Sequence, residues 1–254
     1  MTNTFNILEA NTEFGYMSYF SNDLAFINEL RKGKIYEQDY VIKFLFDIIK
    51  KSNTIIDAGA HAGSHTIIYK HINPKVVIHC FEPQLYMYKL LNHNILKNEL
   101  QDVFTYNYAL ANKQAETTLS AKIDDGREVK LDIHYGGNIY SNLGGIQIGS
   151  GGEKINTMTV DSLNLGSCDF IKMDVEGFEP IVLLGAVETI KKFKPTILFE
   201  NNYQKVSDDV LKEFDIDKEQ YNTLKILKDI GYSDINLIDD NYNYLAVYGD
   251  SSNE

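Results

Sequence analysis

Short apolar runs alternate with segments of helical periodicity through the middle of the chain, from residue 53 to residue 202. The apolar runs, each bounded by polar or turn-forming residues, predict buried strands at 54–58, 76–81, 103–108, 169–173 and 196–199. Apolar residues spaced three or four apart predict helices at 63–71, 85–98 and 180–193. Strands that alternate with helices in this way predict a parallel sheet that is covered on both faces.

The first 52 residues carry helix signals of their own. Asp23 is placed to cap a helix that runs through Leu30. Apolar residues at positions 41, 44, 45, 48 and 49 predict an amphipathic helix over residues 37–51. We therefore expect a helical leader, residues 1–52, packed on residues 53–254 to form a single globular domain.

The last 40 residues or so differ again from the middle of the chain. Residues 219–230 predict a helix closed by Gly231, and strands at 235–238 and 244–248 flank a stretch rich in turn formers. This pattern predicts an antiparallel hairpin at the sheet edge.

Residues 117–159 predict weaker, hairpin-like strands and include a glycine-dense stretch at 136–152, which is either a mobile active-site loop or a chain of β-turns.

Composition and charge indicate which kinds of binding partner and which cellular location to expect. The 254 residues carry a formal charge of −12 and no dense basic cluster, which disfavours nucleic acid as a substrate. No apolar run approaches the roughly 20 residues that a membrane helix needs, and the first ten residues lack the pattern of a signal peptide. Cys80 and Cys168 lie in apolar, strand-like segments and are expected to be buried, reduced thiols, so we expect a cytoplasmic location.

The stretch after the first predicted strand is the first sign of a ligand site. Ligands of open parallel sheets bind beyond the carboxyl ends of the strands, and here Gly59 and Gly63 allow close backbone approach before a helix begins. A dinucleotide fingerprint would need glycine at positions 57 and 62, which hold Asp57 and Ala62, and a P-loop would need a Gly-Lys-Ser/Thr run. We expect Asp57 to attract an ammonium or sulfonium and free N–H groups to receive a carboxylate.

Glu82 ends the second predicted strand, 25 positions after Asp57. An acid at this place can accept two hydrogen bonds from a ribose diol. Nucleoside, cation and amino acid together describe S-adenosylmethionine. The alternatives for the single residues are a helix-capping acid for Asp57 and a surface acid for Glu82.

Six blocks of the sequence carry a resemblance to a known family: 57–66 (DAGAHAGSHT), 81–83 (FEP), 159–163 (TVDSL), 169–179 (DFIKMDVEGFE), 184–186 (LGA) and 194–200 (KPTILFE). With them, residues 33–248 resemble the FkbM-type methyltransferases. The resemblance implies the class I methyltransferase fold, a Rossmann-like three-layer α/β sandwich around a mostly parallel seven-stranded sheet with a C-terminal antiparallel hairpin. It also implies S-adenosylmethionine as cofactor and places the adenine near Asn107 and Ala109.

Polar residues at the other strand ends are candidates for the acceptor chemistry. Asp174 ends the fourth strand beside the cofactor crevice and is also a candidate cofactor contact, and Glu200 and Asn201 end the fifth strand. Their hard oxygen ligands suit Mg²⁺ or Mn²⁺, and the arrangement resembles the metal site of catechol-type O-methyltransferases. In the alternative interpretation these groups bind acceptor hydroxyls, and Asp174 or Glu176 is the general base.

For several other candidate residues, a structural role is an alternative to the functional one. Glu179 either contacts the substrate or favours the dipole of the helix that it opens, and Asn142 lies in the glycine-dense stretch that could close over the acceptor. His61 is a candidate base and cofactor contact, or packs beside the methionine moiety; His65 is expected to form a structural hydrogen bond. Lys172 lies within a buried strand and is expected to pair with a carboxylate.

The sequence as a whole predicts an S-adenosylmethionine-dependent O-methyltransferase. The resemblance implies an acceptor hydroxyl on a sugar, glycan or related small molecule, with no nucleic acid and no membrane insertion. Two alternatives stay open: methylation of a nitrogen or another small-molecule acceptor, and a non-catalytic module that binds the cofactor.

Overall fold

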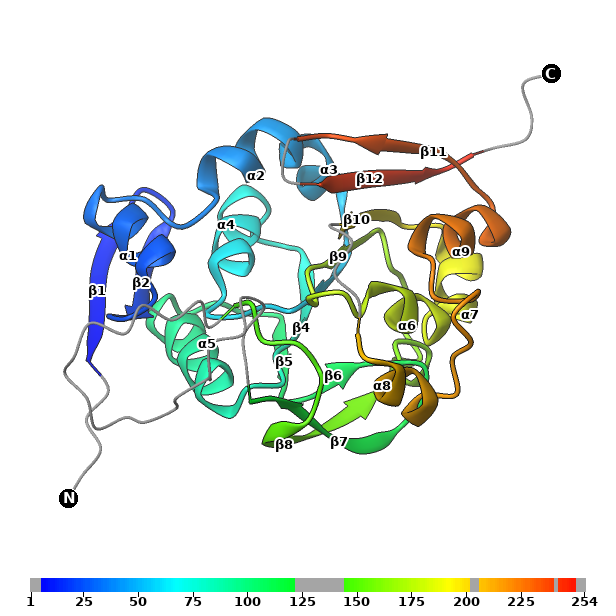
Figure 1. The fold of residues 1–254 in the computed structure, drawn as a ribbon. Coiled ribbons are helices and arrows are strands. Elements are labelled where there is room, and N and C mark those ends of the chain that lie inside the picture. The colour runs from blue at the N-terminus through cyan, green and yellow to red at the C-terminus, as the bar shows by residue number, and fades with distance from the viewer. Residues whose placement is uncertain (1–5, 122–143, 202–205, 240–241, 250–254) are drawn as a thin grey trace.

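A seven-stranded sheet forms the centre of the computed structural model, which describes residues 6–121, 144–201, 206–239 and 242–249 (Figure 1). The strand order is β11-β12-β10-β9-β3-β4-β5. The strands are β3 (Thr54–Ala58), β4 (Val77–Phe81), β5 (Val103–Tyr106), β9 (Phe170–Met173), β10 (Thr196–Glu200), β11 (Tyr232–Leu237) and β12 (Asn243–Tyr248). All five predicted strands of the middle region and both strands of the C-terminal hairpin are therefore confirmed.

The direction of the strands determines where a ligand site can form. β5, β4, β3, β9 and β10 pair in parallel, whereas β12 runs antiparallel to both β10 and β11. The order of the parallel strands reverses between β3 and β9, because β4 follows β3 on one side and β9 lies on the other. In open α/β sheets, the crevice for ligands lies beyond the carboxyl ends of the strands at this reversal.

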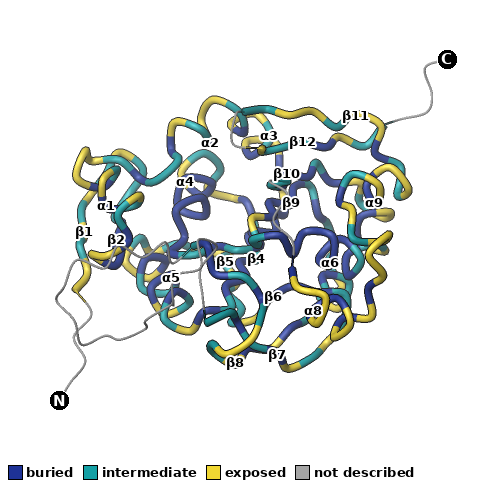
Figure 2. Tube along the Cα trace, in the orientation of Figure 1, coloured by how far each residue is buried: buried dark blue, intermediate teal, exposed yellow. Residues whose placement is uncertain are grey.

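Two hydrophobic clusters cover the two faces of the sheet. Successive residues of a strand belong to opposite clusters: Ile55 packs with the helices of one face and Ile56 with those of the other, and Phe170 and Ile171 divide in the same way. This period of two follows from the alternating direction of side chains along a strand. The buried segments of Figure 2 accordingly run along the central strands and the helix sides that face them.

The helices form the outer layers. One face carries α2 (Gln38–Phe44), α3 (Phe46–Lys51), α4 (Ser64–Ile72) and α5 (Leu85–Lys97), and the other carries α6 (Glu179–Leu184), α7 (Val187–Phe193), α8 (Asp208–Glu213) and α9 (Thr223–Ile230) (Figure 1). None of the helices in the described part of the chain has the length and apolar character needed to cross a membrane. Cys80 and Cys168 are both buried and free, as expected.

Some predicted helices differ in extent from the observed ones. The segments 37–51 and 180–193 each form two helices, and α8 was not predicted. At the second break, Gly185 follows the end of α6, and a Cβ atom there would lie 1.9 Å from the carbonyl oxygen of Ala111, so this close backbone contact requires glycine. The predicted helix 219–230 begins only after Asn222, whose side chain accepts a hydrogen bond from the backbone N–H of Lys225.

The N-terminal segment begins with a hairpin that the expectation of a helical leader did not include, and helices follow it. β1 (Ile7–Thr12) pairs antiparallel with β2 (Gly15–Phe20), and α1 (Leu24–Arg31) follows. The alternating exposure along β1 and the positive φ of Gly15 at the turn are typical of a hairpin. The sequence did not predict this hairpin because its alternating pattern is weak and the helix signals later in the segment are stronger.

A smaller three-stranded sheet lies beside the main one. β7 (Ala115–Ser120) and β8 (Gly151–Met158) pair antiparallel, and the short β6 (Ala109–Leu110) joins β8 in parallel. This confirms hairpin-like strands in the segment 117–159. The predicted strand 103–108 ends earlier than expected, at Tyr106.

Two asparagines of α5 attach β2 to the rest of the molecule. Asn94 is fully buried; its Oδ1 accepts from the backbone N–H of Ser18 (3.0 Å), and its Nδ2 donates to the carbonyls of Ser18 (3.0 Å) and Ala62 (2.8 Å). One turn later, Asn98 makes the same exchange with the backbone of Tyr16. These amides satisfy the edge of β2 as a neighbouring strand would.

Replacing Asn94 with alanine should destabilise the fold. The substitution leaves buried backbone groups of Ser18 and Ala62 without partners, so we expect the free energy of unfolding to fall by about 3 kcal/mol, measured by urea denaturation. Lys89→Ala, at an exposed position of the same helix, should change it little. Equal midpoints for Asn94→Ala and the unmodified protein would show that the amide does not attach the hairpin.

Candidate functional site

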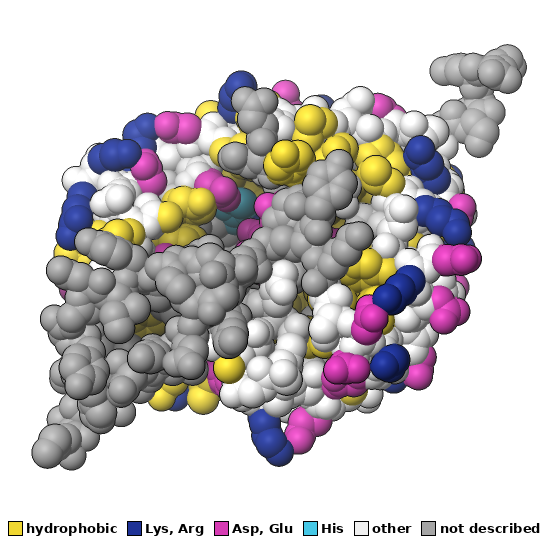
Figure 3. Space-filling view, viewed as in Figure 1, with side chains coloured by type: hydrophobic (Ala, Val, Ile, Leu, Met, Phe, Trp, Pro, Cys, Tyr) yellow, Lys and Arg dark blue, Asp and Glu magenta, His cyan; other side chains and the backbone are white. Residues whose placement is uncertain are grey.

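A cavity of about 530 Å³ opens at the carboxyl ends of β9 and β10. Figure 3 shows a hollow on this face of the molecule, in which a histidine lies among acidic side chains. The lining combines aromatic and charged groups: Phe26, Tyr36, Glu37, Tyr40, His65, Gly144, Lys172, Met173, Asp174, Glu176, Leu198, Glu200, Tyr242 and Asn243. The position beside the reversal of strand order is where the fold predicts a ligand.

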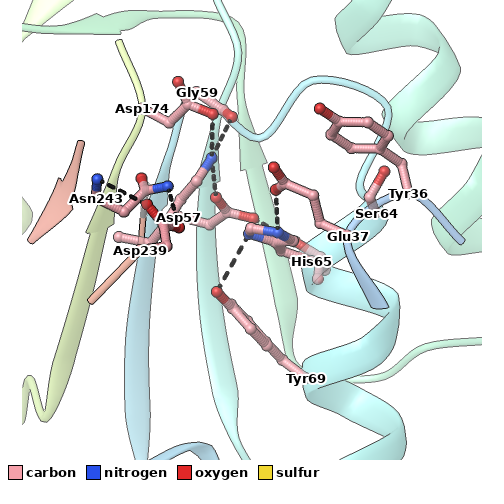
Figure 4. A network of polar contacts seen from close by, with 12 residues as sticks. Tyr36, Glu37, Asp57, Gly59, Ser64, His65, Tyr69, Asp174, Asp239 and Asn243 are labelled. Atoms are coloured by element: carbon pink, nitrogen blue, oxygen red, sulfur yellow. Dashed lines mark hydrogen bonds and ion pairs between the residues drawn. The ribbon is translucent and has the colours of Figure 1, made fainter. Parts of the chain in front are cut away.

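Lys172 is the central charged group of the site. It lies opposite Asp57 in the register of β3 and β9, and its Nζ is 3.4 Å from Asp57 Oδ1, 3.6 Å from Asp174 Oδ2 and 2.8 Å from the carbonyl oxygen of Gly59 (Figure 4). Burial lowers the pKa of Lys172, but the charges of Asp57, Asp174 and Glu37 outweigh burial and raise it above the ordinary value. The expected pairing of Lys172 with a carboxylate is confirmed.

Asp57 does not face the cavity, which corrects its predicted contact with a cationic ligand. Its side chain is completely buried, pairs with Lys172, and accepts a hydrogen bond from Thr66 Oγ1 at 2.9 Å. The reason is the period of the strand: position 57 shares the α4 face with position 55. Asp57 therefore stabilises the site indirectly, by holding the charged end of Lys172, which lines the cavity.

The glycine loop after β3 approaches β9 closely. Gly59 (φ +75°) and Gly63 (φ +89°) both adopt the left-handed conformation, and a Cβ on Gly59 would lie 1.9 Å from the carbonyl oxygen of Asp174. Four of the backbone N–H groups that were predicted to be free are hydrogen-bonded within the protein. The N–H groups of residues 59 and 60 donate to Phe81, that of 61 to Glu82, and that of 63 to residue 60.

Glu82 lies at the end of β4, as predicted, and is buried there. Its Oε2 accepts from the N–H of His61 (2.9 Å) and its Oε1 from the N–H of Gln84 (2.8 Å). Burial raises the pKa of Glu82, although the charge of His61 and the two backbone hydrogen bonds act against it. Each carboxylate oxygen keeps a second lone pair with which it can accept a ribose hydroxyl.

The two residues expected near the adenine have structural roles in the neighbouring turn. Asn107 donates through Nδ2 to the carbonyls of Glu82 (3.0 Å) and Pro83 (2.8 Å), so its amide supports the turn that carries Glu82. Ala109 belongs to β6 and is buried. Neither residue lines the cavity.

Three acidic side chains meet at the cavity. Oxygens of Asp174, Glu176 and Glu200 lie within 4.8 Å of one another, a spacing that could hold a metal ion. Glu176 (φ +55°) and Gly177 (φ +86°) form a left-handed turn, whose carbonyl at Gly177 accepts from the hydroxyl of Tyr221. Glu176 joins the predicted pair of Asp174 and Glu200 in this group. Asn201, predicted as a ligand with them, follows β10 but is not among the residues that line the cavity.

Glu179 lies beneath this turn rather than at the cavity, which corrects its prediction as a substrate residue. It is buried, and its Oε1 accepts from the N–H of Val175 at 3.1 Å. Burial raises the pKa of Glu179 to about 8, and the charges of Asp174 and Glu200 add to the rise, while its backbone hydrogen bonds oppose it. Glu179 therefore supports, through this hydrogen bond, the loop that presents Asp174 and Glu176.

His65 forms a structural pair, as expected, but also lines the cavity. Its Nε2 is 2.9 Å from Glu37 Oε2, and its Nδ1 is 3.4 Å from the hydroxyl of Tyr69 (Figure 4). Burial opposes ionisation of Glu37, but His65 and Lys172 outweigh it and lower the pKa of Glu37. His61, in contrast, stacks on Phe26 and does not line the cavity, so its prediction as a base lacks geometric support.

Several residues of the site come from the N-terminal segment and were not predicted. Phe26, Tyr36, Glu37 and Tyr40 line the cavity although they precede the first strand of the main sheet. No motif marks them in the sequence; the available signal was a cluster of aromatic residues in a segment with a helical pattern. Asn142, predicted to approach the acceptor, lies outside the described residues.

Comparison with known proteins adds to this geometry. The family model described as the methyltransferase FkbM domain matches residues 57–233. No curated protein matches the chain. The crystal structure of methyltransferase FkbM from Methylobacillus flagellatus KT is 20% identical, with a TM-score of 0.50 over 78% of this chain and 44% of that chain. The chain thus spans less than half the length of that protein and shares its fold.

Two further solved structures are similar at lower levels. A SAM-dependent O-methyltransferase from Thermotoga maritima is 13% identical, with a TM-score of 0.43 over 97% of this chain and 79% of that chain. An SAH-bound methyltransferase from Podospora anserina is 12% identical, with a TM-score of 0.47 over 91% of this chain and 85% of that chain.

Removing the charge of Lys172 should destabilise the fold strongly. Lys172→Met leaves Asp57 buried without its counterion, so we expect the free energy of unfolding to fall by about 3–5 kcal/mol, measured by urea denaturation. Adding Asp57→Asn should recover part of this loss, because the two side chains are coupled. Lys191→Met, at an exposed position, is the control; strictly additive effects of the two site substitutions would contradict the coupling.

Glu179 should make stability depend on pH. Because its pKa rises from 4.5 to about 8 on folding, the folded protein keeps a proton that the unfolded chain releases, and the free energy of unfolding falls as pH increases through this window. Glu179→Gln removes this contribution, so the variant should gain stability relative to the unmodified protein between pH 5 and 8, measured by chemical denaturation. For the exposed control Glu213→Gln, the difference in the free energy of unfolding from the unmodified protein should not vary with pH. If the difference for Glu179→Gln is also constant between pH 5 and 8, the pKa of Glu179 does not lie in that range.

Proposed function

Because the chain belongs to the FkbM methyltransferase family, we propose that it is an S-adenosylmethionine-dependent O-methyltransferase that acts on a hydroxyl of a sugar, glycan or glycoside-like acceptor. One observation carries the proposal: Asp174, Glu176 and Glu200 converge in a cavity at the carboxyl ends of β9 and β10, next to the glycine loop. These side chains are where an acceptor hydroxyl would be bound and deprotonated.

The chain's residues fit the cofactor at the glycine loop. Glu82 presents a buried carboxylate at the end of β4, fixed by two backbone N–H groups, and is placed to accept the ribose hydroxyls. Both ring nitrogens of His61 at the same loop are buried and make no hydrogen bond to any described residue, as expected of groups that contact a ligand. When bound, S-adenosylmethionine supplies an electrophilic methyl group on a sulfonium.

Asp174 and Glu176 are the candidate general bases. Asp174 is 47% exposed at its side chain and Glu176 is half-buried, so both can reach an acceptor in the cavity. A sugar hydroxyl is a poor nucleophile, and a carboxylate that takes its proton speeds methylation. Glu200 then orients the acceptor by accepting from a neighbouring hydroxyl, or shares a Mg²⁺ or Mn²⁺ ion with the other two carboxylates.

The lining of the cavity indicates which acceptors fit. The rings of Tyr36, Tyr40 and Tyr242 offer faces on which a sugar ring can stack. Four carboxylates line the cavity, while the charge of Lys172 is already paired with Asp57 and Asp174. Acceptors that carry phosphate or carboxylate groups are therefore disfavoured, and neutral or amino sugars are favoured.

Removing either candidate base should separate chemistry from cofactor binding. We expect Asp174→Asn or Glu176→Gln to lower kcat by about 10²–10⁴-fold on the best neutral acceptor, found in a panel of neutral, amino and uronic sugars. The dissociation constant of S-adenosylmethionine, measured by calorimetry, should change little for Glu176→Gln. Glu213→Gln, an exposed substitution, is the control.

The outcomes distinguish the competing functions. Cofactor binding without turnover on any acceptor would favour a non-catalytic binding module, and methylation confined to amines would favour nitrogen as the acceptor atom. Loss of activity with EDTA and its recovery with Mg²⁺ would assign the three carboxylates to a metal. Absence of S-adenosylmethionine binding by the unmodified protein would refute the proposed function.

A further inference from the structure

Asp23 is a buried acid whose nearest charged partner among the described residues is the ring of His61. It directly precedes α1, yet its side chain does not cap that helix. Its side chain is only 2% exposed, and its Oδ2 has no hydrogen-bond partner among the described residues. A buried carboxylate in this condition is unfavourable for folding and is expected where a ligand completes the site.

The Oδ2 atom of Asp23 faces the glycine loop. It lies 3.3 Å from His61 Nε2, and neither Nε2 nor Nδ1 of His61 makes a hydrogen bond to the part of the chain that the structure describes. The ring of His61 is held by stacking on Phe26, with centroids 4.4 Å apart and planes inclined by 24°. Phe26 also lines the cavity, so the Asp23–His61 pair lies directly behind the cavity wall.

Several of the groups expected to bind an amino acid at this loop are engaged within the protein. Asp57 is paired with Lys172 and Thr66, and the N–H groups of residues 59, 60, 61 and 63 all donate within the protein. An acid other than Asp57 and a donor other than these four N–H groups would therefore serve the amino-acid end of the cofactor. Asp23 and His61 are an acid and a donor with unused polar atoms at this loop.

We propose that Asp23 and His61 form the subsite for the amino-acid end of the cofactor. Asp23 receives the α-ammonium, and the ring N–H of His61 donates to the α-carboxylate. This proposal rests on the proposed function, because it assumes that an adenosyl amino acid binds at the glycine loop. It also places a cofactor residue, Asp23, outside the residues 57–233 that match the family.

The attachment of the N-terminal segment fits this role. The hydroxyl of Tyr19 is 2.8 Å from Ser64 Oγ at the start of α4 and accepts from the backbone N–H of Tyr36 at 3.2 Å. These contacts tie the strand before Asp23 and the chain after α1 to the helix that follows the glycine loop. The position of Asp23 relative to His61 is thus defined from both sides.

A comparison of two ligands tests the proposal by calorimetry. S-Adenosylhomocysteine contains the amino-acid end, whereas 5′-methylthioadenosine has the same nucleoside and thioether without it. Asp23→Asn should weaken binding of S-adenosylhomocysteine by about tenfold or more, because a charge-assisted hydrogen bond is lost. Binding of 5′-methylthioadenosine should change by less than about twofold.

Two further variants keep the test decisive. Asp47→Asn, an exposed acid of the same N-terminal segment, should leave both affinities unchanged. His61→Phe keeps a ring to stack on Phe26 but removes the nitrogens, and it should show the same selective loss; it replaces Asp23→Asn if that variant does not fold.

The results separate this proposal from the proposed function. Equal loss for both ligands would show that Asp23 merely positions the loop, and unchanged affinity for S-adenosylhomocysteine would show that it has no contact; either result overturns the subsite. If the unmodified protein binds neither ligand, the proposed function fails as well.

Discussion

The buried pair of Lys172 and Asp57 is the interaction on which the site depends. Two charges removed from water are stable only when they neutralise each other, so β3 and β9 must keep the register that places them opposite each other. The same ammonium donates to the carbonyl of Gly59 and lies near Asp174. One side chain thereby links the glycine loop, the strand reversal and the acidic group of the cavity.

The N-terminal segment completes what the central sheet begins. The sheet supplies strand ends and the glycine loop, but the aromatic wall of the cavity and the acid beside His61 come from residues before β3. Buried amides on α5 and the hydroxyl of Tyr19 hold this segment in place. The cavity and the proposed cofactor subsite are therefore formed by two parts of the chain that are joined by polar, specific contacts as well as by apolar packing.

Charge is divided across the site according to burial. Three buried acids have structural partners: Asp57 has Lys172, Glu82 has two backbone N–H groups, and Glu179 accepts from the N–H of Val175. Acids that remain accessible, Asp174 and Glu176, face the cavity. This division follows from the cost of burying an unpaired charge, and it explains why several strand-end acids with similar sequence positions have different roles.

The sequence by itself determined the central strands, the C-terminal hairpin, the family resemblance and the acids at the ends of β9 and β10, because apolar runs, periodicity and short motifs are local properties. Only the tertiary structure decided that Asp57 faces Lys172, that Glu179 lies under its loop, that Glu176 joins Asp174 and Glu200, and that an N-terminal hairpin brings Asp23 to His61. Those outcomes depend on strand register and on contacts between residues far apart in the chain, which no local pattern encodes.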